Sequence, residues 1–446
     1  KMKRSKELAL VGQQKPLDNL AALLTSNDAM SVVVVGPPLS GKTALIRELV
    51  RSGKLRRPLI LTSGARLIAG QSGFGQWQER LHRVMMAAEE VGAILYFDDL
   101  SDLFAGQSGG SLDMAGAMRP YIEDGRVRIV GEVSTEALGN LERRHVGFFS
   151  ALHKVRLDEV DAASALEVLR ARVKHGKKLD ARKPALAREA MEPLIELSDR
   201  YLPYQSFPGK AMQILDDLIA MRDSNYLPEE GITITSEDVY KLFCVRTGIP
   251  EFLLREVDSL KRQTILDSFG ERIIGQREAI ARVADVICAV KARLQPPGKP
   301  LATFLFIGPT GVGKTEVAKT LSRFLFGSPD RLVRFDMSEY MDASAAARLI
   351  QGTSSGEGEL TRRVRQQPFC ALLLDEIEKA HSAVFDLLLQ VCGEGRLTDA
   401  RGRTTHFHNA IIIMTSNLGV AHRRDALGFG EAGTSAPNQA HMDEVR

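Results

Sequence analysis

Short runs of hydrophobic residues alternate along the chain with longer segments whose apolar positions recur at helical spacing. The runs at 31–35, 303–307 and 371–374 are almost wholly apolar, whereas the segments 45–50 and 316–326 are amphipathic. Strands buried on both faces of a parallel sheet have the first character, and helices that cover such a sheet have the second. The pattern predicts an α/β fold in which parallel sheets are flanked by helices.

The same order of segments occurs twice. Residues 10–13 (LVGQ) match 273–276 (IIGQ), and residues 94–99 (ILYFDD) match 371–376 (ALLLDE). A glycine-rich sequence lies between the two segments of each copy, so the chain contains two copies of one module. We expect four regions: a first module (1–157), a helical lid that completes it (158–224), a linker (225–262) and a second module (263–446).

Each copy contains the P-loop sequence G-x-x-x-x-G-K-T between an apolar run and a predicted helix. Backbone N–H groups of such a loop wrap a phosphate, the lysine reaches the outer phosphates, and the threonine hydroxyl binds Mg²⁺. A glycine-rich turn that holds Lys-Thr by chance is the alternative, and two occurrences make it negligible. We therefore expect ATP and Mg²⁺ as cofactors. The predicted nucleotide-binding residues are Gly36, Pro37, Pro38, Leu39, Ser40, Gly41, Lys42, Thr43, Gly308, Pro309, Thr310, Gly311, Val312, Gly313, Lys314 and Thr315.

Acidic residues end the apolar run in the middle of each copy. Asp98 and Asp375 are predicted to hold Mg²⁺ through water, beside the hydroxyl ligands of Thr43 and Thr315. The acid that follows in the second copy, Glu376, is predicted to activate the attacking water. A surface acidic pair is the alternative interpretation, and the apolar run before each pair disfavours it.

The first copy departs from this pattern at its second acid. Asp99 stands where a glutamate is expected, and its side chain is one methylene shorter. Because a displacement of ~1 Å at a catalytic group can cost on the order of 10²-fold in rate, we expect this module to bind ATP and hydrolyse it slowly. A polar side chain at a strand tip could position the attacking water. Asn417 is the candidate in the second copy and Ser134 the weaker candidate in the first, since a loop serine is more often merely solvated.

Composition narrows the functional classes further. The 446 residues carry a net charge of +3, and no apolar run approaches the ~20 residues that span a bilayer. No basic stretch interleaved with aromatic residues indicates nucleic-acid binding. His406 and His408 are more consistent with a polar strand face than with a metal site. The four cysteines form no C-x-x-C pair, so neither a zinc ribbon nor a redox motif is indicated, and so few cysteines over this length fit a reducing compartment. We expect a cytoplasmic protein with no membrane or nucleic-acid partner.

Several motifs resemble those of Clp-type AAA+ unfoldases and disaggregases, which have two tandem ATPase modules. The motifs are 335–340 (FDMSEY), 374–381 (LDEIEKAH), 395–399 (GRLTD) and 414–417 (MTSN) in the second copy, 78–81 (QERL) and 198–201 (SDRY) in the first, and 247–250 (TGIP) in the linker. The resemblance covers nearly the whole chain. It implies a homohexameric ring that pulls polypeptides through a central pore using ATP. No long insertion between 157 and 225 corresponds to the coiled-coil lever of one disaggregase branch.

The chain departs from this family at the segments that grip substrate in the pore. In the first copy Gly73 stands at the position of the gripping aromatic, with Phe74 and Trp77 nearby as substitutes. In the second copy the segment 351–359 is shortened and contains no aromatic residue. Gly and Ser cannot supply the buried apolar contact that holds a threaded chain, which disfavours threading by the second module.

The resemblance also suggests an arginine that reaches the nucleotide of a neighbouring subunit. Arg143 and Arg144 resemble this finger segment, although an alternative alignment places Ser150 and Ala151 there. In the second module the finger segment and the lid are expected beyond the last residue of the chain.

Three functions remain open from the sequence. The first is ATP-dependent unfolding or remodelling of proteins, with hydrolysis mainly in the second module. The second is a non-threading scaffold or signalling ATPase whose ring assembly is switched by nucleotide, which the missing aromatics and Asp99 favour. The third, a nucleic-acid motor, is disfavoured by the charge balance. Leu427, Gly428 and Phe429 match a peptidase-docking loop, or else form an ordinary glycine-containing loop.

Overall fold

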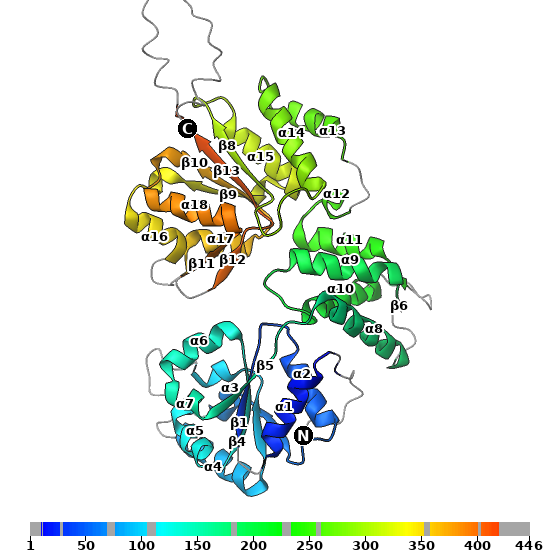
Figure 1. Cartoon of the computed structure of the whole chain (residues 1–446), viewed down its shortest axis with the longest axis vertical. Coiled ribbons are helices and arrows are strands. Elements are labelled where there is room, and N and C mark those ends of the chain that lie inside the picture. The colour runs from blue at the N-terminus through cyan, green and yellow to red at the C-terminus, as the bar shows by residue number, and fades with distance from the viewer. Residues whose placement is uncertain are drawn as a thin grey trace, which may run out of the picture. The chain divides into compact units, whose positions relative to one another are not determined.

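The computed structural model describes residues 10, 12–26, 30–68, 76–104, 113–179, 185–224, 233–255, 260–351, 357–399 and 403–418. The chain divides into two compact units, Lys1–Val239 and Tyr240–Arg446 (Figure 1). Each unit contains a parallel sheet with helices packed on its faces, so the predicted α/β fold with two modules in series is confirmed. Among the described residues, no helix combines the length and the apolar character needed to cross a membrane.

The sheet of the first unit has five parallel strands in the order β2-β3-β4-β1-β5. All five residues of β1 are buried, which explains its unbroken apolar sequence. Apolar side chains of α1 and α2 cover one face of the sheet, and those of α4 and α5 cover the other. These elements are β1 (Ser31–Val35), β2 (Leu59–Thr62), β3 (Ile94–Phe97), β4 (Arg128–Val133), β5 (Leu152–Arg156), α1 (Gln14–Thr25), α2 (Lys42–Arg51), α4 (Gln76–Val91) and α5 (Met114–Glu123).

The rest of the first unit is mainly helical. Its elements are α3 (Gly64–Ile68), η1 (Leu100–Phe104), α6 (Thr135–Arg144), α7 (Val146–Ser150), α8 (Ala162–Leu179), β6 (Ala185–Leu186), α9 (Arg188–Tyr201), α10 (Gly209–Ser224), β7 (Thr233–Ile234) and α11 (Ser236–Thr247). The predicted lid corresponds to α8, α9 and α10. However, β7 lies in the predicted linker and pairs in parallel with β6, and the unit boundary falls within α11. The finer subdivision into four regions stays a prediction.

The sheet of the second unit has four parallel strands in the order β8-β13-β10-β9. A separate antiparallel hairpin is formed by β11 and β12. The elements are α12 (Glu251–Leu254), α13 (Arg262–Gly270), α14 (Arg277–Lys291), β8 (Ala302–Ile307), α15 (Lys314–Phe326), η2 (Pro329–Arg331), β9 (Leu332–Asp336), η3 (Met337–Tyr340), α16 (Ala343–Gln351), α17 (Glu359–Gln366), β10 (Ala371–Asp375), η4 (Ile377–Lys379), α18 (Ser382–Glu394), β11 (Arg396–Thr398), β12 (Thr404–His406) and β13 (Ile411–Ser416).

The two sheets share a register at their P-loops. The N–H of Gly36 donates to the carbonyl of Val133 at 3.3 Å, and the N–H of Gly308 donates to the carbonyl of Ser416 at 3.2 Å. The pairing of β3 with β4 and of β10 with β13 extends this correspondence to the central strand of each copy. The resulting equivalent pairs are Glu132 with Thr415, Ser134 with Asn417, Asp98 with Asp375, and Asp99 with Glu376.

Candidate active site

The second P-loop connects β8 to α15, as its sequence predicts. Gly308, Gly311 and Gly313 adopt φ angles of 154°, 86° and 99°, which favour glycine. The Nζ atom of Lys314 lies over the loop and donates to the carbonyls of Gly308 at 2.6 Å and Pro309 at 3.1 Å. An ammonium group over a glycine-rich loop at the N-terminus of a 13-residue helix fits the phosphates of a nucleotide.

The strand-end acid of the second unit is bound on both of its oxygens. The hydroxyl of Thr415 donates to Oδ1 of Asp375, and Nη2 of Arg334 donates to Oδ2 at 2.6 Å. The N–H of Glu376 donates in turn to Oγ1 of Thr415 at 3.0 Å. The carboxylate of Asp375 and the hydroxyl of Thr315 are hard oxygen donors, which Mg²⁺ prefers, so the residues present fit this ion.

The candidate general base, Glu376, is held in one orientation by two neighbours. Nδ2 of Asn417 donates to Oε1 at 3.2 Å, and Nζ of Lys379 lies 2.5 Å from Oε2. The hydrogen bond from Lys379 to this carboxylate raises the pKa of Lys379. Glu376 has a φ of 55°, a left-handed conformation that is unfavourable for a residue with a side chain and that occurs often at functional sites.

Three of the predicted residues of the second module, Lys314, Asn417 and Glu376, form one hydrogen-bonded group. Oδ1 of Asn417 accepts a hydrogen bond from Nζ of Lys314 at 2.7 Å, while its Nδ2 contacts Glu376. Asn417 thus joins the phosphate-binding lysine to the candidate base. Burial lowers the pKa of Lys314, and the charges of Asp375, Glu378 and Glu376 oppose that shift.

The first P-loop has the same path with different side chains. Nζ of Lys42 donates to the carbonyls of Gly36 at 2.9 Å and Pro37 at 2.8 Å, as in the second loop. A Cβ atom on Gly36 would lie 2.3 Å from the carbonyl oxygen of Leu157, so only glycine fits there. Gly41 precedes α2 with a φ of 99°. This loop also fits a nucleotide.

Leu39 occupies a backbone position that suits glycine, a feature that the sequence analysis missed. Its φ is 67°, and the equivalent residue of the second loop is Gly311. The N–H of Gly209, at the start of α10, donates to the carbonyl of Leu39 at 3.1 Å, and the N–H of Ser206 donates to the carbonyl of Pro38 at 3.3 Å. A Cβ on Gly209 would lie 2.5 Å from the Cβ of Leu39. The first turn of α10 is therefore in direct contact with the P-loop.

At the strand tips of the first unit, the side chains of Asp99 and Ser134 bind nearby backbone. Asp98 and Asp99 are both exposed, and Oδ1 of Asp99 accepts a hydrogen bond from the N–H of Ser101 at 2.9 Å. Oγ of Ser134 accepts from the N–H of Ala137 at 3.1 Å and caps α6. Neither side chain makes the contacts that Glu376 and Asn417 make in the second unit.

A third acid in the first site was not identified from the sequence. Glu132 lies on β4 with only 4% of its surface exposed, and it receives hydrogen bonds from the hydroxyls of Thr43 and Tyr96. Burial raises the pKa of Glu132, while the hydrogen bonds from Tyr96 and Thr43 oppose this effect. A glutamate near the end of a strand that is otherwise apolar from Ile129 onward was the signal available, since glutamate is almost never fully buried without a partner.

The structure locates some of the other predicted residues. Arg143 and Arg144 are exposed at the end of α6, where Nε of Arg143 donates to the carbonyl of Gly139 at 2.9 Å. Trp77 is half-buried on α4 and packs against the core of the first unit. Phe74 lies outside the described residues, as do Leu427, Gly428 and Phe429.

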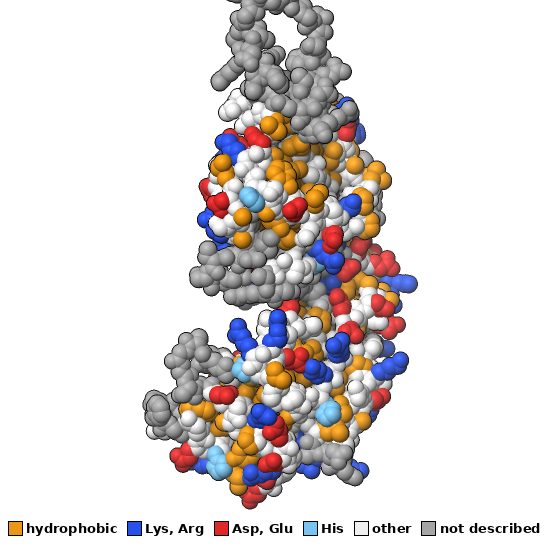
Figure 2. All heavy atoms as spheres, turned by 60° about the vertical axis from the view of Figure 1, so that its left-hand side comes forward, with side chains coloured by type: hydrophobic (Ala, Val, Ile, Leu, Met, Phe, Trp, Pro, Cys, Tyr) orange, Lys and Arg blue, Asp and Glu red, His pale blue; other side chains and the backbone are white. Residues whose placement is uncertain are grey.

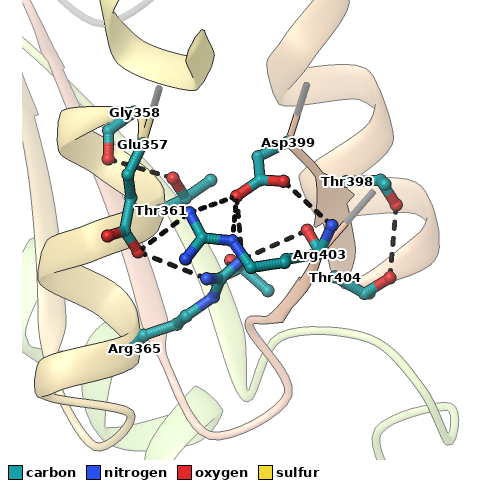
Figure 3. A network of polar contacts seen from close by, with 9 residues as sticks. Glu357, Gly358, Thr361, Arg365, Thr398, Asp399, Arg403 and Thr404 are labelled. Carbon is teal, nitrogen blue, oxygen red and sulfur yellow. Dashed lines mark hydrogen bonds and ion pairs between the residues drawn. The ribbon is translucent and has the colours of Figure 1, made fainter. Parts of the chain in front are cut away.

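A buried ionic network borders the shortened segment of the second unit (Figure 3). The side chain of Asp399 has no exposed surface, and its Oδ2 accepts from Arg365 at 3.2 Å and from Arg403 at 2.9 Å. Glu357 lies 3.2 Å from Arg365 and 3.5 Å from Arg403. These contacts join Arg365 of α17, and Glu357 just before that helix, to the β11–β12 hairpin.

Comparisons with known proteins agree with this architecture. Residues 32–140 match the AAA model, described as the ATPase family associated with various cellular activities, and residues 299–446 match the AAA domain model of the Cdc48 subfamily. The ATP-binding subunit ClpC of the ATP-dependent Clp protease from Staphylococcus aureus is 29% identical over 96% of this chain. The ClpC subunit from Staphylococcus epidermidis is 28% identical over 95%. The chain spans 61% of the length of both relatives.

Solved structures of Hsp104 are similar across both units. A closed-state reconstruction of Hsp104 with ATPγS and casein has a TM-score of 0.78 and 26% identity, and it covers 98% of this chain and 77% of that one. The Saccharomyces cerevisiae Hsp104–ADP complex has a TM-score of 0.76 and 27% identity, with 100% and 78% covered. The chain therefore contains two AAA modules in series, and over nearly its whole length it is similar to the Clp-type AAA+ proteins ClpC and Hsp104.

Proposed function

We propose that this chain hydrolyses ATP, chiefly in its second module, and that it uses the energy to remodel or unfold polypeptides as part of a ring. The observation that carries the proposal is the contact of Asn417 with both Lys314 and Glu376 at the mouth of a P-loop. The relatives add support, because ClpC is named as the ATP-binding subunit of a protease and one Hsp104 structure contains casein.

The second module would bind and orient its reactants with its own groups. Backbone N–H groups of the loop 308–315 and the Lys314 ammonium would bind the phosphates, and Thr315 and Asp375 would hold Mg²⁺. The ion, when bound, offsets the negative charge of the phosphates. Glu376 would accept a proton from the attacking water, and the amide of Asn417 fixes Oε1 for that step.

The first module would bind ATP and turn it over slowly. Its P-loop and Lys42 have the arrangement of the second module, but Asp99 is short and its carboxylate accepts from Ser101. Head-to-tail packing of identical modules closes a ring, which the family forms as a hexamer, and Arg143 or Arg144 remains the candidate for the trans-acting arginine.

The test is ATP-dependent unfolding of a tagged, stably folded model protein by the full-length protein. We expect unfolding that is lost in Lys314→Ala, because that lysine binds the phosphates in the module assigned to hydrolysis. A Phe74→Ala variant tests whether the first module grips substrate. Hydrolysis of ATP without unfolding of any model substrate would favour the non-threading scaffold or signalling ATPase instead.

The half-buried position of Trp77 supports this second candidate. A side chain packed against the core is less available to grip a threaded chain than an exposed loop aromatic. Nucleic-acid binding remains disfavoured, since basic and acidic side chains are interspersed on the face shown in Figure 2. Docking to a peptidase through Leu427, Gly428 and Phe429 would appear as degradation of the unfolded substrate by an added peptidase partner.

Lengthening the short acid of the first module should increase its activity. In a Lys314→Ala background, Asp99→Glu should raise steady-state ATP hydrolysis at least tenfold. The upper bound is on the order of 10²-fold, the rate that a displacement of ~1 Å at a catalytic group costs. Asp99→Asn is the matched control and should lower it. An unchanged rate in Asp99→Glu would mean that side-chain length does not limit this module.

A further inference from the structure

Glu132 gives the first nucleotide site a carboxylate that the second site lacks. The equivalent residue on β13 is Thr415, whose hydroxyl donates to Asp375. In the first unit no threonine is available at this position to bind the strand-end acid. In the strand register, Glu132 lies directly beside Val34 of β1, the strand that leads into the P-loop.

Both carboxylate oxygens of Glu132 accept hydrogen bonds from buried or half-buried hydroxyls. Oγ1 of Thr43 donates to Oε2 at 3.0 Å, and the hydroxyl of Tyr96 donates to Oε1. Tyr96 is 1% exposed, and burial, followed by its hydrogen bond to Glu132, raises its pKa, so the phenol stays a donor. Glu132 is therefore fixed on one side by Tyr96 and directed on the other toward Thr43.

Thr43 is the residue whose hydroxyl is expected to bind Mg²⁺. A hydroxyl has one proton to donate and two lone pairs. When its proton is directed to Glu132, the lone pairs of Oγ1 are available for a cation. Mutation of a group that orients a metal ligand by a hydrogen bond typically lowers metal affinity by about 10–100-fold.

We propose that Glu132 is a positioning residue for Mg²⁺ in the first module and acts through the hydroxyl of Thr43. The inference rests on the proposed nucleotide site of that module. In the second module the equivalent residue, Thr415, is itself a donor and binds Asp375, so no carboxylate stands at this position there. The first site thus keeps its metal ligand oriented although Asp98 is exposed.

The experiment measures the affinity of a fluorescent ATP analogue with Mg²⁺ and with EDTA, in a Lys314→Ala background so that binding reports the first module. The quantity of interest is the gain in affinity that Mg²⁺ provides. We expect Glu132→Ala to reduce this gain about tenfold and to leave the metal-free affinity within about twofold, because the metal ligand and not the phosphate cradle is affected. Glu132→Gln should fall between, since its amide oxygen accepts the Thr43 proton without the charge.

A double-mutant cycle separates positioning from other roles of Glu132. With Thr43→Val in place, adding Glu132→Ala should cause no further loss of the Mg²⁺ gain. A further loss of similar size would show that Glu132 acts on the ion directly, and the proposal would be wrong. Tyr96→Phe perturbs the same buried cluster but keeps the Thr43 contact, so it should reduce the gain less than Glu132→Ala does. An equal loss would also overturn the proposal.

The same measurements distinguish the role of Glu132 from the proposed nucleotide binding by the first module, on which it rests. Binding that is lost in Lys42→Ala and retains its full Mg²⁺ gain in Glu132→Ala would overturn the inference alone. Absence of any Lys42-dependent binding would overturn the assignment of a nucleotide site to the first module, and the inference with it.

Discussion

Glu376→Gln should reduce steady-state ATP hydrolysis by the second module by about 10²–10⁴-fold, the usual contribution of a general base. Glutamine keeps the shape of the side chain and can still accept from Asn417, but it cannot take a proton from water. Nucleotide affinity should therefore stay close to that of the unmodified protein, and the variant should hold ATP. Hydrolysis is measured by phosphate release in a Lys42→Ala background, and affinity by binding of a fluorescent ATP analogue.

The matched control for this prediction is Glu394→Gln. Glu394 is paired with Arg396 at 3.1 Å, and both side chains are 61% exposed, so the change should leave hydrolysis unaltered. Hydrolysis by Glu376→Gln at the unmodified rate would contradict the assignment of the base, even though Glu376 contacts Asn417 and Lys379.

Asp399→Ala should destabilise the second unit by about 3–5 kcal/mol, because it removes the fully buried counter-ion of Arg365 and Arg403 and leaves only the partly exposed Glu357 beside them. The carboxylate has no exposed surface and accepts from both arginines and from the N–H of Arg403. Native-state hydrogen exchange, read on peptides from α17 and the β11–β12 hairpin, measures the loss within this unit. The exposed pair again supplies the control, since Glu394→Ala should have a far smaller effect. Unchanged protection in Asp399→Ala would show that the network contributes little.

The same network sets an expected acid dependence. Burial would raise the pKa of Asp399, but hydrogen bonds from the backbone and side chain of Arg403 hold it below its ordinary value. The folded unit then binds fewer protons at this site than the unfolded chain. The stabilisation is present above the ordinary carboxyl pKa, about 4, and is lost as the pH falls through the folded value. Asp399→Ala should remove this part of the acid sensitivity.

The order of strands and helices could be predicted because each element has a local pattern of apolar and polar residues. Unbroken apolar runs such as that of β1 arise from burial on both faces of a parallel sheet, and this burial is observed. The P-loops were predictable because their chemistry requires fixed spacing between glycine, lysine and threonine. The acids were also predictable in this way, since Asp98 directly follows β3 and Asp375 is the last residue of β10.

The contacts across strands could not be predicted in the same way. Glu132 lies 89 residues from Thr43 in the sequence, and only the parallel register of β1 with β4 brings them together. The linker interpretation of 225–262 missed β7 for a similar reason, because a two-residue strand is recognisable only through its partner β6. Leu39 follows no local rule, since its left-handed backbone is favoured by contacts with Gly209 and not by its own side chain.

The contact of Leu39 with α10 has a thermodynamic consequence. A leucine in the left-handed region costs about 1–3 kcal/mol, so this P-loop depends on neighbouring groups to keep its shape. If phosphate binding shifts the carbonyl of Leu39, the hydrogen bond from Gly209 must respond. A protein that binds α10 would then change the affinity of the first module for nucleotide. Because binding free energies are reciprocal, nucleotide would change the affinity of α10 for that protein by the same factor. A partner bound to α10 would in this way both respond to the nucleotide occupancy of the first module and change it.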